Sequence, residues 1–168
     1  MTDGYETYKS IEGITHAECW AHARRYFYES VPLDLHKKML VTAEGYKGIE
    51  LIDALFDVER EISSFSIEEK LIARREKSEP ILKEFYEWVN LTNQKYITNE
   101  KLKKAINYVI NQKNELCEFL NDGKVHLTNS RAERSIRPFA VHRKNWLFAD
   151  TVDGANANAV YYSLIEFG

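Results

Sequence analysis

The most regular feature of the chain is a spacing of apolar residues at steps of three and four, which is typical of one buried face of an α-helix. The longest such run covers residues 35–62 and predicts a single long helix. Two glycines, Gly45 and Gly48, interrupt good helix formers within this run. We therefore expect the helix to bend near them.

Three further helices are predicted downstream by their terminal signals. Ser66 and Glu69 have the spacing of a capping box, which opens a helix that continues to about residue 77. Pro80 suits the first turn of a second helix. Thr98 is the expected cap of a third helix, which ends at the turn-forming residues 121–123.

The two ends of the chain have a mixed pattern. Near the start, residues 14–20 are expected to form a short strand and residues 21–29 a helix. Near the end, residues 130–138 read as helical, residues 145–149 as a short strand and residues 155–166 as a final helix. The predicted fold class is mainly α with a small β component, in which a long helical middle separates two mixed segments.

Composition restricts the class of protein further. The chain has 168 residues, of which 44% are hydrophobic and 29% charged, so it can build a core. It has no apolar run of the roughly 18 residues that a membrane helix needs, and its first residues lack an export signal. We therefore expect a cytoplasmic protein with no membrane partner, whose two cysteines, Cys19 and Cys117, are free thiols.

Charge is distributed unevenly along the chain. The formal net charge is -3, which alone argues against a nucleic-acid-binding protein. Residues 124–145, however, hold six basic residues and one acid, a net of +5, which leaves −8 on the remainder. This segment predicts a surface for phosphate groups. A solvated helix with scattered ion pairs is the competing interpretation.

Two acids are candidates for chemistry. Glu133 follows Ser130 at capping-box spacing, so its carboxylate has either a structural role at a helix start or a metal-binding role. Asp3 precedes a glycine, which suits an ordinary turn and equally a catalytic Asp at the end of a strand.

Cys19 and His22 have a spacing that suits two zinc ligands, but a closed structural zinc site needs four. Cys117 and His126 are the candidates for the other two, although their spacing fits no common zinc module. A buried thiol beside a histidine that bonds the backbone is the alternative that we prefer.

Taken together, these segments resemble a known family. The run GITHAECWAHARRYF is similar to the Cys-Trp-Ala-His-Ala-Arg-Arg segment of the insertion-sequence sixty-six transposases. The run LTNSRAERSIRPFAVHRKNWLFADTVDGANANAVYYSLIE resembles that family's C-terminal catalytic block almost from end to end, and TDGYETY resembles its Asp-Gly-Tyr segment. The resemblance covers essentially the whole chain, and its last block is the most specific part.

The resemblance implies a DDE transposase with a ribonuclease-H-like fold, in which Asp3 is the second acid and Glu133 the third. Residues 1–34 are then part of the ribonuclease-H-like core, residues 35–123 a helical insertion, and residues 124–168 the Glu-bearing helix with the C-terminal part of the core. Cys19 and His22 take a supporting role. DNA contacts are expected from Arg131, Arg134, Arg137, Arg143 and Lys144.

Such a site holds two magnesium ions about 4 Å apart between clustered carboxylates. The first Asp of the family belongs upstream of Met1, and no residue here can take its place. We therefore expect a fragment of a transposase that is inactive alone, with transposon and target DNA as partners and possible pairing with a full-length transposase or a second copy. Two alternatives remain: a non-enzymatic helical module that binds DNA or protein, and a zinc-stabilised helical protein.

Overall fold

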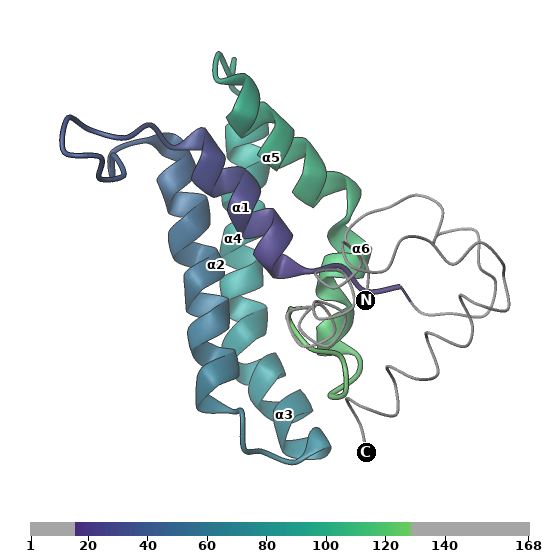
Figure 1. Cartoon of the computed structure of the whole chain (residues 1–168). Coiled ribbons are helices and arrows are strands. Elements are labelled where there is room, and N and C mark those ends of the chain that lie inside the picture. Colours follow the sequence, from purple (N-terminus) through teal and green to yellow (C-terminus); the bar gives the residue numbers. More distant parts are fainter. Residues whose placement is uncertain (1–15, 129–168) are drawn as a thin grey trace, which may run out of the picture. The chain divides into compact units, whose positions relative to one another are not determined.

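The computed structural model describes residues 16–128, which belong to one compact unit of the chain. Six α-helices and two short helical turns of other types follow one another in this part (Figure 1). In order they are α1 (Trp20–Ser30), α2 (Glu44–Glu61), α3 (Ile67–Ala73), the π-helical turn η2 (Arg74–Ser78), α4 (Glu79–Asn93), α5 (Glu100–Asn111), α6 (Lys113–Cys117) and the 3-10 turn η3 (Glu118–Leu120).

The helices form a bundle around an aromatic core. Helix α1 packs against α2 and α5, and α2 packs against α4. Phe85 of α4 lies at the centre, with its ring centroid 5.4 Å from that of Trp20 and 5.9 Å from that of Phe27, both in edge-on geometry. All three side chains are fully buried. Edge-on aromatic pairs add to the free energy gained by burial, so this cluster fixes α1 against α4.

The mainly helical prediction is confirmed for the described residues, whereas the predicted strand is not. Residues 16–19 form no regular strand, and Trp20 already belongs to α1. Within residues 16–128, an isolated antiparallel β-bridge joins Leu33 to Met39. The expected ribonuclease-H-like core falls largely on residues outside this range and stays a prediction, as do the three domain boundaries.

The long helix predicted for residues 35–62 begins nine residues later than expected, at Glu44. Residues 32–43 instead form a hairpin-like loop, which projects from the bundle in Figure 1. The carboxylate of Asp34 accepts hydrogen bonds from the backbone N–H groups of His36 and Lys38, each at 2.8 Å. These local bonds satisfy the backbone without a helix, and Lys37 takes a positive φ of 59° at the tip.

The two glycines of α2 permit close packing rather than a bend. A Cβ atom at Gly48 would lie 2.8 Å from Cδ1 of Phe27 and 3.0 Å from a ring carbon of Trp88. One at Gly45 would collide with the hydroxyl of Ser30. Since both partners of Gly48 are aromatic rings, α1 and α4 can approach α2 only because this position has no side chain.

The helices predicted from Ser66 and Pro80 are joined without a break. The capping box is confirmed, because the Ser66 hydroxyl accepts from the Glu69 N–H and the Glu69 carboxylate accepts from the Ser66 N–H. Beyond α3 the π-helical turn η2 leads directly into α4, with Pro80 in its first turn. The cap of α5 is Asn99 rather than the expected Thr98.

Arg74, the first residue of η2, is the most buried charged side chain described. It is 1% exposed and forms a two-pronged ion pair with Glu59 of α2, at 2.7 and 2.8 Å. Its remaining nitrogen donates to the backbone carbonyls of Phe119 and Asp122. The guanidinium therefore ties α2, η2 and the turn after α6 together.

No helix within residues 16–128 is both long enough and apolar enough to cross a membrane.

Replacing Arg74 by Met is expected to lower the free energy of unfolding by about 3–5 kcal/mol, because the Glu59 carboxylate would be left half-buried without its partner. Urea unfolding followed by circular dichroism measures this change. Arg75→Met is the matched control: Arg75 is the next residue and is exposed, so it should change stability by less than about 0.5 kcal/mol. Equal effects of the two variants would contradict the assigned role of Arg74.

Gly48→Ala is expected to destabilise the protein by about 1–3 kcal/mol, because the new methyl group would overpack against Phe27 and Trp88. On helix propensity alone the same change should stabilise by about 1 kcal/mol, so the sign of the effect separates the two explanations. Glu50→Ala, at an exposed position of the same helix, is the control and should have little effect. A higher melting temperature for Gly48→Ala would refute the close approach.

Candidate functional site

The site predicted from the sequence falls mostly on residues that the structure does not describe. Asp3, Glu133 and the basic residues Arg131, Arg134, Arg137, Arg143 and Lys144 all lie outside residues 16–128, so their roles stay predictions. The described part does show how the chain enters and leaves the helical bundle between those two groups. That entry and exit point is the feature of the structure that bears on the site.

The two ends of the described region are hydrogen-bonded to one another. The backbone N–H of Trp20 donates to the carbonyl of Leu127 at 3.0 Å, and the N–H of Glu18 donates to the carbonyl of Glu115 at 3.0 Å. The indole N–H of Trp20 donates to the carbonyl of Leu116 at 2.8 Å, in a fully buried position. We call this set of contacts, made by residues 18–20 with residues 115–127, the junction.

A buried acid adds to the junction. Glu18 is 2% exposed, and the hydroxyl of Tyr108 on α5 donates to its carboxylate at 3.5 Å. Burial raises the pKa of Tyr108, and the neighbouring Glu18 charge raises it further, so the hydroxyl remains protonated and can donate. The contact between Tyr108 and Glu18 therefore supports the junction from α5, in addition to the backbone bonds and the indole bond of the junction itself.

Cys19 and His22 lie in the first turn of α1, next to the junction. Cys19 is buried and precedes the first helical residue, and the backbone N–H of His22 donates to its carbonyl at 3.0 Å. Both cysteines of the chain are free. These two residues help to start α1 where the chain leaves the junction, which is compatible with the supporting role that we expect.

The zinc alternative receives no support from the structure. Cys19, His22, Cys117 and His126 all lie in the described range, and no group of three or more potential metal-binding side chains occurs there. Cys117 faces Tyr86 of α4 instead. A closed structural zinc site needs four ligands at one point, so these four residues do not form one.

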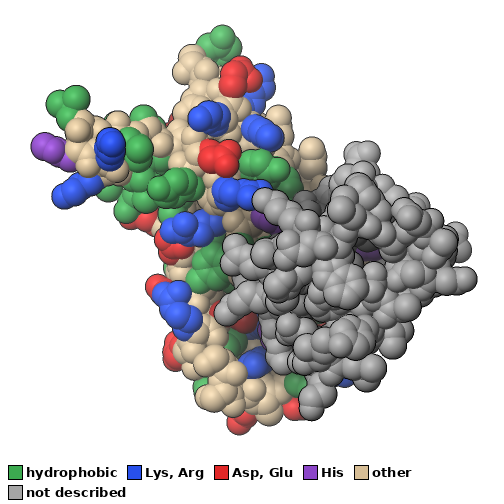
Figure 2. Space-filling view, viewed as in Figure 1, with side chains coloured by type: hydrophobic (Ala, Val, Ile, Leu, Met, Phe, Trp, Pro, Cys, Tyr) green, Lys and Arg blue, Asp and Glu red, His purple; other side chains and the backbone are tan. Residues whose placement is uncertain are grey.

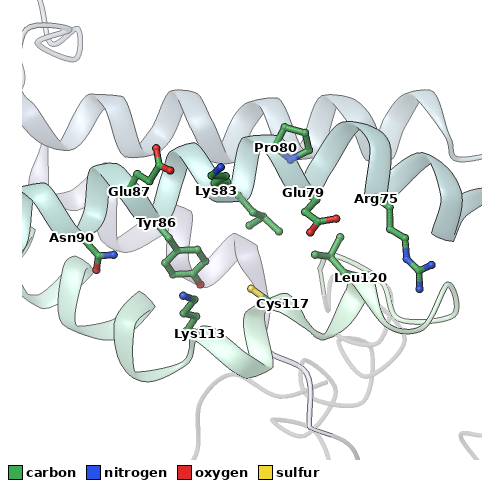
Figure 3. A pocket seen from close by; sticks show the side chains of 11 residues that line it. Arg75, Glu79, Pro80, Lys83, Tyr86, Glu87, Asn90, Lys113, Cys117 and Leu120 are labelled. Atoms are coloured by element: carbon green, nitrogen blue, oxygen red, sulfur yellow. The ribbon is translucent and has the colours of Figure 1, made fainter.

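A shallow groove of about 770 Å³ runs between α4 and the segment that contains α6 and η3 (Figure 3). Tyr86 points from α4 toward Lys113, whose ammonium lies 4.8 Å from the centre of the ring, and toward Cys117. Burial raises the pKa of both Tyr86 and Cys117. A protonated thiol and phenol are poor nucleophiles, so we expect neither side chain to act as one.

Analysis of the sequence missed the junction, although one signal was present. Trp20 lies within the Cys-Trp-Ala-His run, where only Cys19 and His22 were given a role. A tryptophan at the start of a helix needs a hydrogen-bond partner if it is buried. Its partner, Leu116, lies 96 residues further along the chain, and no local pattern indicates it.

Trp20→Phe is expected to cost about 1–3 kcal/mol, because the Leu116 carbonyl would be left buried without a donor while the aromatic packing is largely kept. Hydrogen exchange of the Trp20 backbone amide should accelerate as the junction loosens. Trp88→Phe is the control, because the Trp88 indole makes no hydrogen bond with any residue from 16 to 128. Unchanged exchange in Trp20→Phe would show that the indole does not hold the junction.

Comparison with known proteins shows to which family the chain belongs. The chain matches the model described as "Transposase IS66 family" over residues 1–157. It is similar to two uncharacterized proteins of Sinorhizobium fredii: to y4hP at 34% identity, covering 90% of this chain and 29% of that protein, and to y4jD at 30% identity, covering 99% and 33%. The chain thus spans about a third of the length of these relatives. No solved structure matches it. The chain belongs to the IS66 family of transposases.

Proposed function

We propose that this chain supplies two of the three acids of a DDE site for DNA transposition, Asp3 and Glu133, and that the helical bundle is an insertion between them. Membership of the family connects the chain with transposition and with DNA. The single observation that carries the proposal further is the junction. An insertion within a folded core has to begin and end at neighbouring points, and residues 18–20 and 127 are hydrogen-bonded neighbours.

The length of chain on either side is compatible with a shared site. Glu133 follows Leu127 by six residues, which span at most roughly 22 Å when extended. Asp3 precedes Glu18 by 15 residues, which span at most roughly 54 Å. Both carboxylates therefore have enough chain to reach one point near the junction. Without the junction, a separation of 130 positions in the sequence would not bring the two carboxylates close together.

The donor chemistry also fits. Asp3 and Glu133 offer carboxylate oxygens, which are the ligands that magnesium prefers. Magnesium ions bound there would activate the attacking oxygen and stabilise the leaving oxygen during strand cleavage and transfer. Arg131, Arg134 and Arg137, with Arg143 and Lys144, would hold the DNA backbone, since a guanidinium can bond two phosphate oxygens at once.

The alternative function is a helical module that binds DNA or a protein without catalysing a reaction. The observation that favours it is the net charge of +5 over residues 124–145, which can attract a polyanion without any reaction. The two proposals differ in what Asp3 and Glu133 do. In the first they share divalent ions, and in the second their substitution has no effect on metal binding.

Binding of Mn²⁺ to the purified 168-residue chain, measured by electron paramagnetic resonance, tests the proposal. We expect weak binding that is lost in both Asp3→Asn and Glu133→Gln, because two carboxylates share the ion. Glu100→Gln, which removes an exposed acid of α5, should leave binding unchanged. Binding that is unaffected by both site substitutions would favour the non-enzymatic module.

The same proposal predicts that these 168 residues alone do not carry out strand transfer, because the first Asp of the family's three acids is not among them. An assay with a supercoiled plasmid and magnesium checks this. Robust nicking by the pure chain that is lost in Glu133→Gln would contradict the need for the first Asp.

A further inference from the structure

The residues outside 124–145 carry a net charge of −8, but their charges are unevenly distributed over the helices. The segments that form α1, the hairpin-like loop and α5, residues 20–43 and 94–111, hold eight basic residues and three acids. The stretch from α2 to α4, residues 44–93, holds seven basic residues and twelve acids. Because α1 packs directly on α5, these basic residues lie on two neighbouring helices and the loop that follows α1. Figure 2 shows lysine and arginine side chains over α1, α5 and the loop.

Six of these basic side chains are not neutralised within the described part of the chain. Arg24 and Lys95 are paired across to α2, with Asp53 and Glu44 respectively. In contrast, no ion pair with a residue between 16 and 128 involves the exposed side chains of Arg25, Lys37, Lys38, Lys101, Lys103 and Lys104. Although the net charge of the protein is -3, these unneutralised positive charges can attract a polyanion locally.

The centre of this surface is a shallow recess of about 380 Å³ between α1 and α5. Tyr26 of α1 and Tyr108 of α5 line it, with their ring centroids 4.8 Å apart, and the Lys104 ammonium lies 5.0 Å from the centre of the Tyr26 ring. Lys103, Asn107 and the acid Glu100 also line the recess. Its ammonium and amide groups are donors that suit phosphate oxygens.

We infer that α1 and α5 form a second DNA-binding surface, which holds the phosphate backbone of a DNA duplex through Arg25, Lys103 and Lys104. This inference rests on the proposed function, since it takes DNA as the ligand. The hairpin-like loop extends the surface with Lys37 and Lys38, beside the fully exposed Leu35. Because the contacts are to phosphate, binding on this face should be insensitive to DNA sequence and sensitive to salt.

Binding of the whole chain to a duplex, measured by fluorescence anisotropy at several salt concentrations, tests the inference. The triple variant Arg25→Gln, Lys103→Gln and Lys104→Gln should reduce the slope of log K against log salt by about 3. At about 0.1 M salt its affinity should fall at least about tenfold. Lys37→Gln with Lys38→Gln should reduce the slope by about 2, and an unchanged slope would overturn the extension to the loop.

A matched control removes the same charge from the other side of the bundle. Lys70→Gln, Arg75→Gln and Lys83→Gln should change the affinity by no more than about twofold, because charges on the far side are screened. Circular dichroism and urea unfolding verify that each variant is folded. An equal loss of affinity in both triple variants would overturn the inference, since net charge rather than the α1–α5 surface would then govern binding.

The outcomes separate this inference from the proposed function. If the α1–α5 variant binds DNA as the unaltered chain does, while Arg131→Gln with Arg134→Gln and Arg137→Gln does not, the inference is wrong and the proposed function stands. If the unaltered chain does not bind DNA at all, both fail. If the α1–α5 variant loses affinity only for vesicles that contain phosphatidylserine, the surface binds a membrane and the inference is wrong.

Discussion

The arrangement of the helical bundle depends on the pairing of its own two ends at Trp20. One residue makes three kinds of contact: its backbone N–H bonds Leu127, its indole N–H bonds Leu116, and its ring packs edge-on against Phe85. Because the indole is completely buried, the bond to Leu116 is needed to offset the desolvation of the N–H group. The first turn of α1 is thereby fixed to the last part of the bundle and to its core.

A second residue, Arg74, fixes the segment that leads to Leu127. Arg74 donates to the carbonyls of Phe119 and Asp122, which precede the turn-rich segment that leads to Leu127. The ion pair with Glu59 fixes the position of Arg74, so α2 determines where the chain leaves the bundle.

Charge is also distributed differently between the two groups of helices. Acids concentrate in the stretch from α2 to α4, where Arg74 and Lys47 pair with Glu59 and Glu84. On α1, the loop and α5, only Arg24 and Lys95 of the eight basic residues pair with an acid between residues 16 and 128.

Helices could be predicted from the sequence wherever spacing and a cap agree, as at Ser66. Prediction failed where a side chain bonds the local backbone and so favours a turn over a helix. Leu35 and Met39 fit a helical face, but the Asp34 carboxylate accepts hydrogen bonds from the backbone and stabilises a turn instead. The junction was beyond prediction because its partners are nearly a hundred residues apart. The local sequence made Asp3 and Glu133 candidates, but their roles as second and third acid came from family resemblance, since an Asp before a glycine has no distinctive local pattern.

The chain enters and leaves the helical bundle at two hydrogen-bonded positions, Trp20 and Leu127, so the bundle is a unit that could be exchanged as a whole. Its size can change without altering the separation of the segments that precede residue 18 and follow residue 127, because those segments meet at one backbone contact. Replacing the whole bundle by a short connector across that contact would leave the flanking chain at an unchanged spacing. We therefore expect that adding or removing a helix within residues 20–127 would leave the spacing of the flanking segments unchanged.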